Sequence, residues 1–480
     1  MLSSGKWSLA ILFLLVLSLP TAHAFESDGN LTTPDNWQQH VSAGQLKQSF
    51  AGIGLSDETK MYLTLTTRLR LKSNEYADDQ DVYQYLRMHT DSAKLGSGTV
   101  KAALFGRIAA DINGNSGREW GENKYYIHRD ILDSEASDDD YAGRLYHGYL
   151  QFDNVVRNTS LAAGRIYTDH LNQLHLDGAD ASVRLSDSFS VYAFGGAPVS
   201  YYYDRDSDSI YGAGFSAAYG SKVSFGAEYA KIDAEDIDDN YAKLRLTGTV
   251  KGGYVVVEYT DLNNSGTFSA SADYEIAKTG TIINFGYETL TDVIDSDKTY
   301  VVNPITYALL PESKYSKYSV SVYQAFLRYF AAGLSYEAKS VDGEGDFDNR
   351  DYAKYGCRFD INGLPHKDTY ISVSLDKWDV DSVESSNDED RFQYSVQAGQ
   401  RVGESFDVWL GSAFSRFEYD YSSDKRKDFV RSYYVGGEYR FSDKVSFMVD
   451  LNREDTDFYD DSDKDLSKNY TAEIWANIVF

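Results

Sequence analysis

The last residues of the chain alternate between two kinds of side chain and stop on an aromatic residue. One face carries Tyr470, Ala472, Ile474, Ala476, Ile478 and Phe480, and the other carries Thr471, Glu473, Trp475, Asn477 and Val479. Side chains of a β-strand point alternately to its two faces. The sequence therefore predicts an amphipathic C-terminal strand with an apolar environment on one side and a mostly polar one on the other.

The same alternation recurs along the chain in segments separated by turn residues. Apolar faces are formed by Leu63, Leu65, Leu69 and Leu71; by Tyr355, Cys357, Phe359 and Ile361; by Ile371, Val373 and Leu375; by Phe392, Tyr394, Val396 and Ala398; and by Val445, Phe447, Val449 and Leu451. Alternating segments of about ten residues are typical of transmembrane β-barrels. We therefore predict an all-β fold, a transmembrane antiparallel up-and-down barrel.

The connections between these segments alternate between short and long. The short ones are 186–188, 220–221, 251–253, 277–280, 362–365, 402–404 and 442–443, and the long, mostly acidic ones are 111–142, 203–209, 233–239, 290–313, 342–351, 379–390 and 454–467. Barrels of this class have short periplasmic turns and longer extracellular loops. With Phe480 at the periplasmic edge, the short connections become periplasmic turns and the long acidic ones extracellular loops.

The segments sum to about 22 strands, with an acceptable range of 18 to 22 and an even number. The first strand is expected near 60–71 and the last at 468–480. The segment 314–341 has no obvious turn, and the hairpins within 72–98 and 143–167 are ambiguous. The predicted barrel therefore occupies residues 60–480.

The N-terminal residues have the pattern of a secretory signal peptide. Lys6 precedes an apolar run over 9–19, and Ala22-His23-Ala24 provides a small-residue cleavage site. A transmembrane anchor is the alternative, but so short a run is not long enough to span a bilayer. We predict a signal peptide over 1–24 and an N-terminal periplasmic or lumenal segment over 25–59.

Composition excludes several other classes of protein. The chain carries 74 acidic and 46 basic side chains, a net charge of −28, which argues against nucleic-acid binding and against general attraction to anionic lipid. A lone Cys357 excludes an intramolecular disulfide framework. No long uninterrupted apolar run follows residue 24, so a membrane location requires a closed barrel.

Two resemblances agree with this fold. The C-terminal strand, through Tyr470, Ile474, Ile478 and Phe480, resembles the closing strand of Gram-negative outer-membrane β-barrels, whose end is read by the barrel-assembly machinery. The segments 163–167, 176–179 and 194–198 resemble a G-R…D-G-A pattern of porin-like families. These resemblances imply a location in the cell outer membrane, contact with its lipid and lipopolysaccharide, and a porin-like channel that passes small hydrophilic solutes or ions.

Charged side chains recur on the faces opposite the apolar ones. We take these as candidate pore-lining residues: Arg68, Arg70, Arg107, Arg184, Glu228, Lys243, Arg245, Glu258, Arg358, Glu438, Arg440 and Glu473, with Glu275 on the same pattern. They either solvate an interior wall or form a charged constriction that orients solutes and selects ions. Which of them share one level of the barrel is not determined by the sequence.

The acidic connections allow a second interpretation. Segments 133–140, 233–239 and 454–465 supply hard oxygen ligands of the kind that bind Ca²⁺ or Mg²⁺, but none has EF-hand spacing. Solvated loops that give the barrel a negative outer mouth are the better interpretation. The long segment 111–142 contains aromatic residues, and both it and segment 25–59 are candidates to fold into the lumen.

No enzymatic motif or cofactor site is recognisable. His147, His170 and His175 lie near Ser160 and Asp169 in the sequence, without the spacing of a catalytic or metal site. We predict that the chain is not an enzyme and binds no cofactor of its own. The alternative function is a sheath around a partner multihaem cytochrome, because a barrel of this size encloses a wide lumen and segment 25–59 is too short for a plug domain.

Overall fold

The structure, a computed structural model, describes residues 60–73, 78–112, 141–171, 174–199, 208–234, 237–262, 265–293, 313–342, 350–381, 389–421, 424–457 and 468–480. The signal peptide 1–24, the segment 25–59 and most of 111–142 lie outside the described residues. The acidic segment 133–140 and parts of 233–239 and 454–465 also lie outside them. Among the described residues, no helix is long and apolar enough to cross a membrane.

Every regular element in the described residues is a β-strand. The strands are β1 Met61–Ser73, β2 Asp78–Thr90, β3 Ala93–Leu95, β4 Gly98–Asp111, β5 Tyr141–Asp153, β6 Thr159–Tyr167, β7 His175–Ser186, β8 Phe189–Pro198, β9 Ser209–Tyr219, β10 Val223–Ala234, β11 Ile237–Val250, β12 Gly253–Leu262, β13 Ser265–Ile276, β14 Thr281–Leu290, β15 Tyr315–Phe326, β16 Phe330–Val341, β17 Tyr352–Asn362, β18 Thr369–Val380, β19 Glu389–Val402, β20 Phe406–Tyr421, β21 Asp424–Ser442, β22 Val445–Asp457 and β23 Lys468–Val479. Apart from β3, β20 and β21, they are 9–14 residues long, close to the alternating segments of about ten residues in the sequence.

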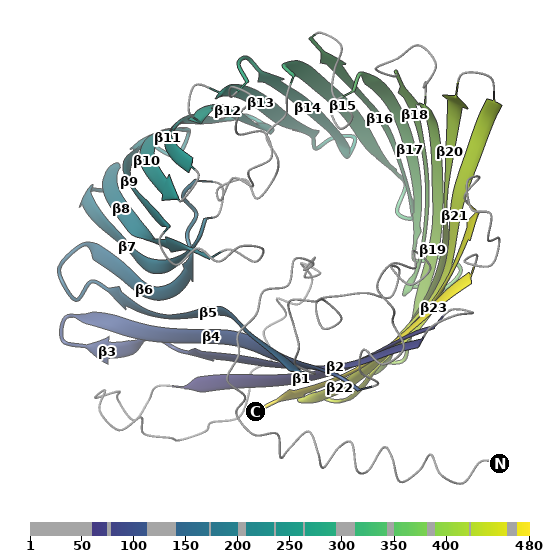
Figure 1. Cartoon of the computed structure of the whole chain (residues 1–480), viewed down its shortest axis with the longest axis horizontal. Helices are drawn as coiled ribbons and strands as arrows, with labels where there is room; N and C mark the ends of the chain where they lie inside the picture. Colours follow the sequence, from purple (N-terminus) through teal and green to yellow (C-terminus); the bar gives the residue numbers. More distant parts are fainter. Residues whose placement is uncertain are drawn as a thin grey trace.

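These strands form one closed antiparallel sheet (Figure 1). Strand β1 pairs with both β2 and β23, which joins the first strand to the last. The three-residue β3 pairs with β4, as β2 does, so β2 and β3 together make one interrupted crossing. The 23 strands in the described residues thus make 22 crossings, which confirms the predicted fold and strand number.

The C-terminal strand closes the barrel. Its register against β1 runs from Val479 opposite Thr64 to Tyr470 opposite Ser73. The backbone N–H of Phe480 also donates a hydrogen bond of 2.9 Å to the carbonyl of Leu63. Closure gives both outermost strands a partner, which removes the exposed sheet edges that an apolar phase does not tolerate.

The two ends of the barrel differ in their connections. At the end that holds Phe480, the longest connection in the described residues is 363–368, and all seven predicted short turns lie here. The opposite end holds every longer connection between strands. Segment 233–239 differs from its prediction as a long loop, because β10 ends at Ala234 and β11 begins at Ile237. A turn at 327–329, which the sequence did not reveal, divides segment 314–341.

The two faces of the closed sheet differ in polarity. Large apolar side chains such as Leu244, Leu246, Leu410, Val435 and Phe447 lie on one face and are well exposed. Between the ends of the same strands, charged residues such as Lys243, Glu438 and Asp450 lie on the opposite face. An exposed apolar surface that continues around a closed sheet is not typical of a water-soluble protein and is expected where lipid surrounds the barrel.

Candidate functional site

The candidate pore-lining residues all lie on one face of the sheet. The register carries this face from strand to strand: Arg70 lies opposite Glu473 on β23, and Arg245 lies opposite Glu258 on β12. The face holds Arg68, Arg70, Arg107, Arg184, Glu228, Lys243, Arg245, Glu258, Glu275, Arg358, Glu438, Arg440 and Glu473. Alternation in the sequence was sufficient to group them, because a strand has only two faces.

Contacts that bridge over a whole strand identify this face as the inner one. The hydroxyl of Tyr192 on β8 donates a hydrogen bond of 2.7 Å to Glu228 Oε2 on β10. Likewise, Trp409 Nε1 on β20 donates a hydrogen bond of 2.9 Å to Asp450 Oδ1 on β22. Neighbouring strands are about 4.8 Å apart, so partners two strands apart meet most readily where side chains converge, on the concave side. The polar face is therefore the inside of the barrel.

Glycine residues on the intervening strands make room for these bridges. A Cβ at Gly214 on β9 would lie 2.4 Å from the hydroxyl of Tyr192. A Cβ at Gly436 on β21 would lie 2.4 Å from Nε1 of Trp409. An aromatic ring can therefore lie across the glycine of the next strand and reach its hydrogen-bond partner beyond it. The arrangement packs the rings along the wall.

Most of the candidate residues on β10–β22 are paired along the wall. Glu258 lies 3.2 Å from the amine of Lys243 and 3.8 Å from Nε of Arg245. Arg358 Nε lies 2.9 Å from Asp360. The guanidinium of Arg440 pairs with Asp407 and lies 3.5 Å from Glu438. These ion pairs join residues of the same or adjacent strands, so the described contacts balance charge locally on the wall.

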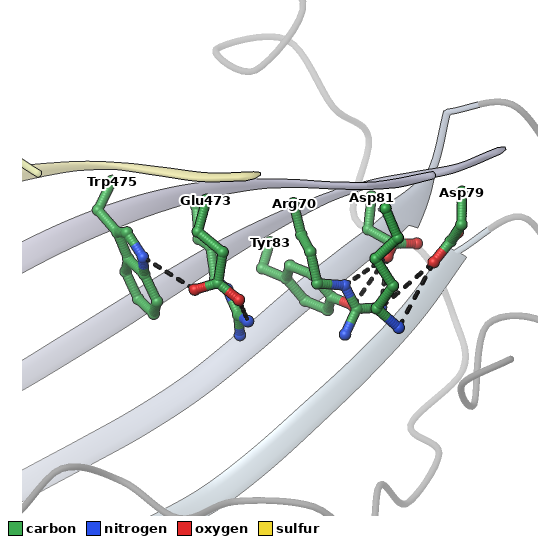
Figure 2. Close-up of polar contacts among 8 residues, drawn as sticks. Arg70, Asp79, Asp81, Tyr83, Glu473 and Trp475 are labelled. Carbon is green, nitrogen blue, oxygen red and sulfur yellow. Dashed lines mark hydrogen bonds and ion pairs between the residues drawn. The ribbon is translucent and has the colours of Figure 1, made fainter. Parts of the chain in front are cut away.

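A denser cluster lies at the seam where β23, β1 and β2 meet (Figure 2). Arg68 forms an ion pair with Glu473, and its guanidinium carbon lies 4.8 Å from the ring centre of Trp475 and 5.2 Å from that of Tyr83. Arg70 donates a hydrogen bond of 2.9 Å from Nε to Asp81. Cation–π and ionic contacts thus link the first two strands to the last one.

The cluster continues onto β4 and β5 as a packed core. Tyr83, Tyr85 and Tyr146 are buried together with two alanines, and Phe105 and Trp475 pack against them. Arg107 lies over Tyr83 and Arg144 lies over Tyr146, and these side chains belong to residues that are only 6% and 3% exposed. Arg107 therefore lies on the inner face, but it is buried within this wall.

Three buried carboxylates lie at the same part of the wall. Asp79, Asp81 and Asp111 place oxygen atoms within 4.8 Å of one another, a spacing compatible with a metal ion. Arg70 pairs with Asp81, and the amine of Lys72 lies 3.7 Å from Asp79. Cations of the chain itself therefore already neutralise much of this acidic cluster.

Residues 168–171 and 174, after β6, fold onto the inner face, which the sequence did not predict. We call residues 168–171 and 174 the inner loop. Leu171 and Leu174 are fully buried in one core cluster with Phe194 and Ile232. The backbone N–H of Leu171 donates a hydrogen bond of 2.9 Å to Glu228 Oε1. Glu228, on the inner face, is therefore covered by this loop and buried.

His170 attaches the inner loop to the wall. Its Nε2 lies 3.0 Å from Asp180 and its Nδ1 lies 3.4 Å from Glu228. Burial lowers the pKa of His170, but the hydrogen bonds and charges of Asp180 and Glu228 outweigh this effect and raise the pKa to about 9. The imidazole is thus cationic at neutral pH. The sequence singled out His170 and Glu228 separately, and only the fold brings them together.

The inner wall is recessed over β14–β18. A hollow of about 460 Å³ is lined there by the hydroxyl and amide groups of Ser321, Ser335, Ser374 and Asn284, with Arg358 and Asp376 among its other lining residues. Small polar side chains leave space that larger residues would fill. This part of the wall therefore combines a recess with several polar side chains.

No protein-family model matches this chain, and no curated protein matches it in sequence. Several solved outer-membrane porins are similar at low identity. OpdK of Pseudomonas aeruginosa, crystallised with vanillate, is 11% identical, with 89% of this chain and 100% of OpdK covered and a TM-score of 0.43. A BenF-like porin from Pseudomonas fluorescens Pf-5 is also 11% identical, with 89% of this chain and 100% of that porin covered and a TM-score of 0.44. OccAB2 of Acinetobacter baumannii is 11% identical, with 89% of this chain and 98% of OccAB2 covered and a TM-score of 0.44. The barrel assignment rests on the strand pairing of this chain itself.

Proposed function

We propose that this protein is a porin-like channel of a bacterial outer membrane that passes small hydrophilic solutes or ions. The observation that carries the proposal is the closed sheet with a polar, charged inner face and an exposed apolar outer face. Only a closed barrel satisfies all backbone groups of β-strands in lipid. A polar inner face in turn favours water inside the barrel.

The ends of the chain support the same location. We infer that residues 1–24 direct export and that the strand with Tyr470, Ile474, Ile478 and Phe480 is read by the barrel-assembly machinery. The end that holds Phe480 is then periplasmic, since its connections are short. The opposite end, with its long acidic connections, faces outward.

The inner wall divides into two parts in this proposal. Paired but partly exposed charges, such as those of Lys243, Arg245, Glu258 and Arg440, line the water path. Arg107 and Glu228 are buried and support the wall. Local pairing keeps the electric field along the path moderate, which suits solutes of low net charge.

Single-channel recording of the purified full chain in a planar bilayer tests the function. We expect discrete conductance steps in KCl. In Glu258→Gln, the loss of one acid beside Lys243 and Arg245 should shift the zero-current potential toward anion selectivity. Glu418→Gln removes a carboxylate from the outer face and serves as the matched control, with no shift expected.

A barrel that inserts into the bilayer but shows no conductance steps would contradict the proposal. Haem absorbance that copurifies with the chain from its native membrane would instead favour the sheath around a multihaem cytochrome. The two outcomes are separable, because the recording uses the isolated chain and the absorbance is measured on the native preparation.

A further inference from the structure

Basic side chains gather on the outer face of β20–β23, near the end opposite Phe480. The register places Arg416 opposite Phe429, Arg431 opposite Phe414, and Arg453 opposite Tyr433 and Tyr470, all on the apolar face. The same register places Lys427 and Lys468 on this face. We call Arg416, Lys427, Arg431, Arg453 and Lys468 the basic belt.

Aromatic rings lie among and below the basic belt. The guanidinium carbon of Arg431 lies 5.3 Å from the ring centre of Phe414 and 5.9 Å from that of Phe429, and the guanidinium carbon of Arg453 lies 5.9 Å from the ring centre of Tyr470. Exposed aliphatic residues, Leu410, Val435 and Leu451, follow toward the other end. Aromatic girdles mark the two interfaces of a membrane barrel, so the basic belt lies at headgroup level.

Acidic neighbours compensate only part of this charge. Glu418 lies 2.9 Å from Nε of Arg416 and 3.0 Å from the amine of Lys427, and Asp455 lies 2.8 Å from Nε of Arg453. Among the described side chains on the outer face of β20–β23, five cations thus face two carboxylates, and Asp390 on β19, opposite Glu418, lies 3.8 Å from the amine of Lys377. The same end of the outer face on β10–β12 is acidic instead, with Asp233 and Asp238 beside Lys231 and Asp261 on the next strand. The basic belt is a local exception in a strongly acidic chain.

An arginine on the lipid face is strongly unfavourable in the middle of the hydrocarbon layer and nearly neutral at the interface. A guanidinium has five N–H donors, and the contacts with Glu418 and Asp455 use only some of those of Arg416 and Arg453. Arginine forks match the geometry of phosphate oxygens. The charge of the basic belt, its position at headgroup level and the geometry of its arginine donors therefore all favour a phosphate group as its ligand.

We propose that the basic belt is a binding site for the phosphate groups of an anionic, phosphorylated lipid headgroup in the outer leaflet. The proposal rests on the membrane location inferred above, and it adds a specific lipid contact to it. The aromatic rings below the belt would contact the first part of the acyl chains. The site lies on β20–β23 beside the seam, where it would hold lipid against the strands that close the barrel.

Binding of bisphosphorylated lipid A to the delipidated full chain in detergent tests the site, with native mass spectrometry as the readout. The test variant is Arg416→Gln/Arg431→Gln/Arg453→Gln. The control, Lys222→Gln/Lys278→Gln/Arg328→Gln, removes the same charge from turns at the Phe480 end. We expect the wild type and control to bind alike and the belt variant to bind about tenfold more weakly or worse, from loss of charge-assisted contacts.

Equal binding by the belt variant, or equal loss in the control, would overturn the proposal. Equally tight binding of dephosphorylated lipid A would show that phosphate is not recognised, and equally tight binding of zwitterionic phosphatidylcholine would show that the anionic charge is not. Full displacement of lipid A by inorganic phosphate would make the site one for small anions and would also overturn the proposal. Retained conductance in the belt variant shows that the barrel is intact, so failure of the site and failure of the channel are separate results. If the triple variant does not assemble, Arg431→Gln alone replaces it. This single substitution leaves the ion pairs of Glu418 and Asp455 intact.

Discussion

The imidazole of His170 lies flat against the phenol ring of Tyr192, with the ring centroids 3.9 Å apart. Both side chains contact the same carboxylate, that of Glu228, through Nδ1 of His170 and the hydroxyl of Tyr192. The stack therefore joins the inner loop to strands β8 and β10. A chain segment that would otherwise project into the lumen is attached to the wall by one cation, one ring and one acid.

Raising the pH should loosen the inner loop. The pKa of His170 rises from its ordinary 6.5 to about 9 in the fold, so its contribution to stability is complete below about pH 6.5 and disappears as the pH rises through about 9. We expect hydrogen-exchange protection of the Leu171 amide to fall between pH 7 and pH 10. In His170→Gln this fall should be absent. Equal pH dependence in both proteins would show that His170 does not control the loop.

Substitution in a row of three glycines should destabilise the barrel. Gly164, Gly178 and Gly196 lie opposite one another on β6, β7 and β8, and a Cβ at Gly178 would lie 2.1 Å from the carbonyl oxygen of Gly195. The backbone of the neighbouring strand β8 cannot easily move away from the added methyl group. Gly178→Ala should therefore lower the free energy of unfolding by about 1–3 kcal/mol.

Gly248 provides the control for the glycine row, because a Cβ there would meet nothing within 4 Å. Gly248→Ala should leave urea unfolding in detergent micelles nearly unchanged. The row also gives a physical reason for the three short glycine-containing segments seen in the sequence. If Gly178→Ala and Gly248→Ala unfold at the same urea concentration, close backbone packing is not that reason.

The ion pair at the seam should contribute measurably to stability. Arg68 and Glu473 are about four-fifths buried and join the first strand to the last. A double-mutant cycle with Arg68→Gln and Glu473→Gln should give a coupling free energy of about 1–3 kcal/mol in urea unfolding. The exposed pair Lys367 and Asp368 in a turn should give almost none. Similar coupling for both pairs would mean that burial at the seam adds nothing.

Thiol labelling should distinguish the two faces residue by residue. Cys357 is exposed on the outer face of β17, and its neighbour Arg358 is on the inner face. In a lipid nanodisc, Cys357 should react with an apolar maleimide and resist a charged methanethiosulfonate. In a Cys357→Ser background, Arg358→Cys and Ser374→Cys should show the reverse preference. Uniform labelling by the charged reagent would contradict the assignment of the faces.

Much of the architecture was already determined by local sequence patterns. The alternation from Tyr470 to Phe480 predicts a strand with two unlike faces, and the pairing of β23 with β1 confirms that it closes the barrel. Short connections such as 277–280 and 443–444 lie together at one end. These features depend on neighbouring residues, because side-chain direction and turn length are properties of a few consecutive residues.

Tertiary structure alone decided which residues of different strands meet. Nothing near His170 in the sequence indicates Glu228, and Arg107 has the same alternating pattern as Arg358 although one is buried and the other exposed. The basic belt likewise assembles from separate strands. The physical reason is that closing 22 crossings fixes a stagger between strands, and this stagger determines which side chains share a level of the wall. The sequence thus determined the barrel and its two faces, and the closed register determined where its charges gather.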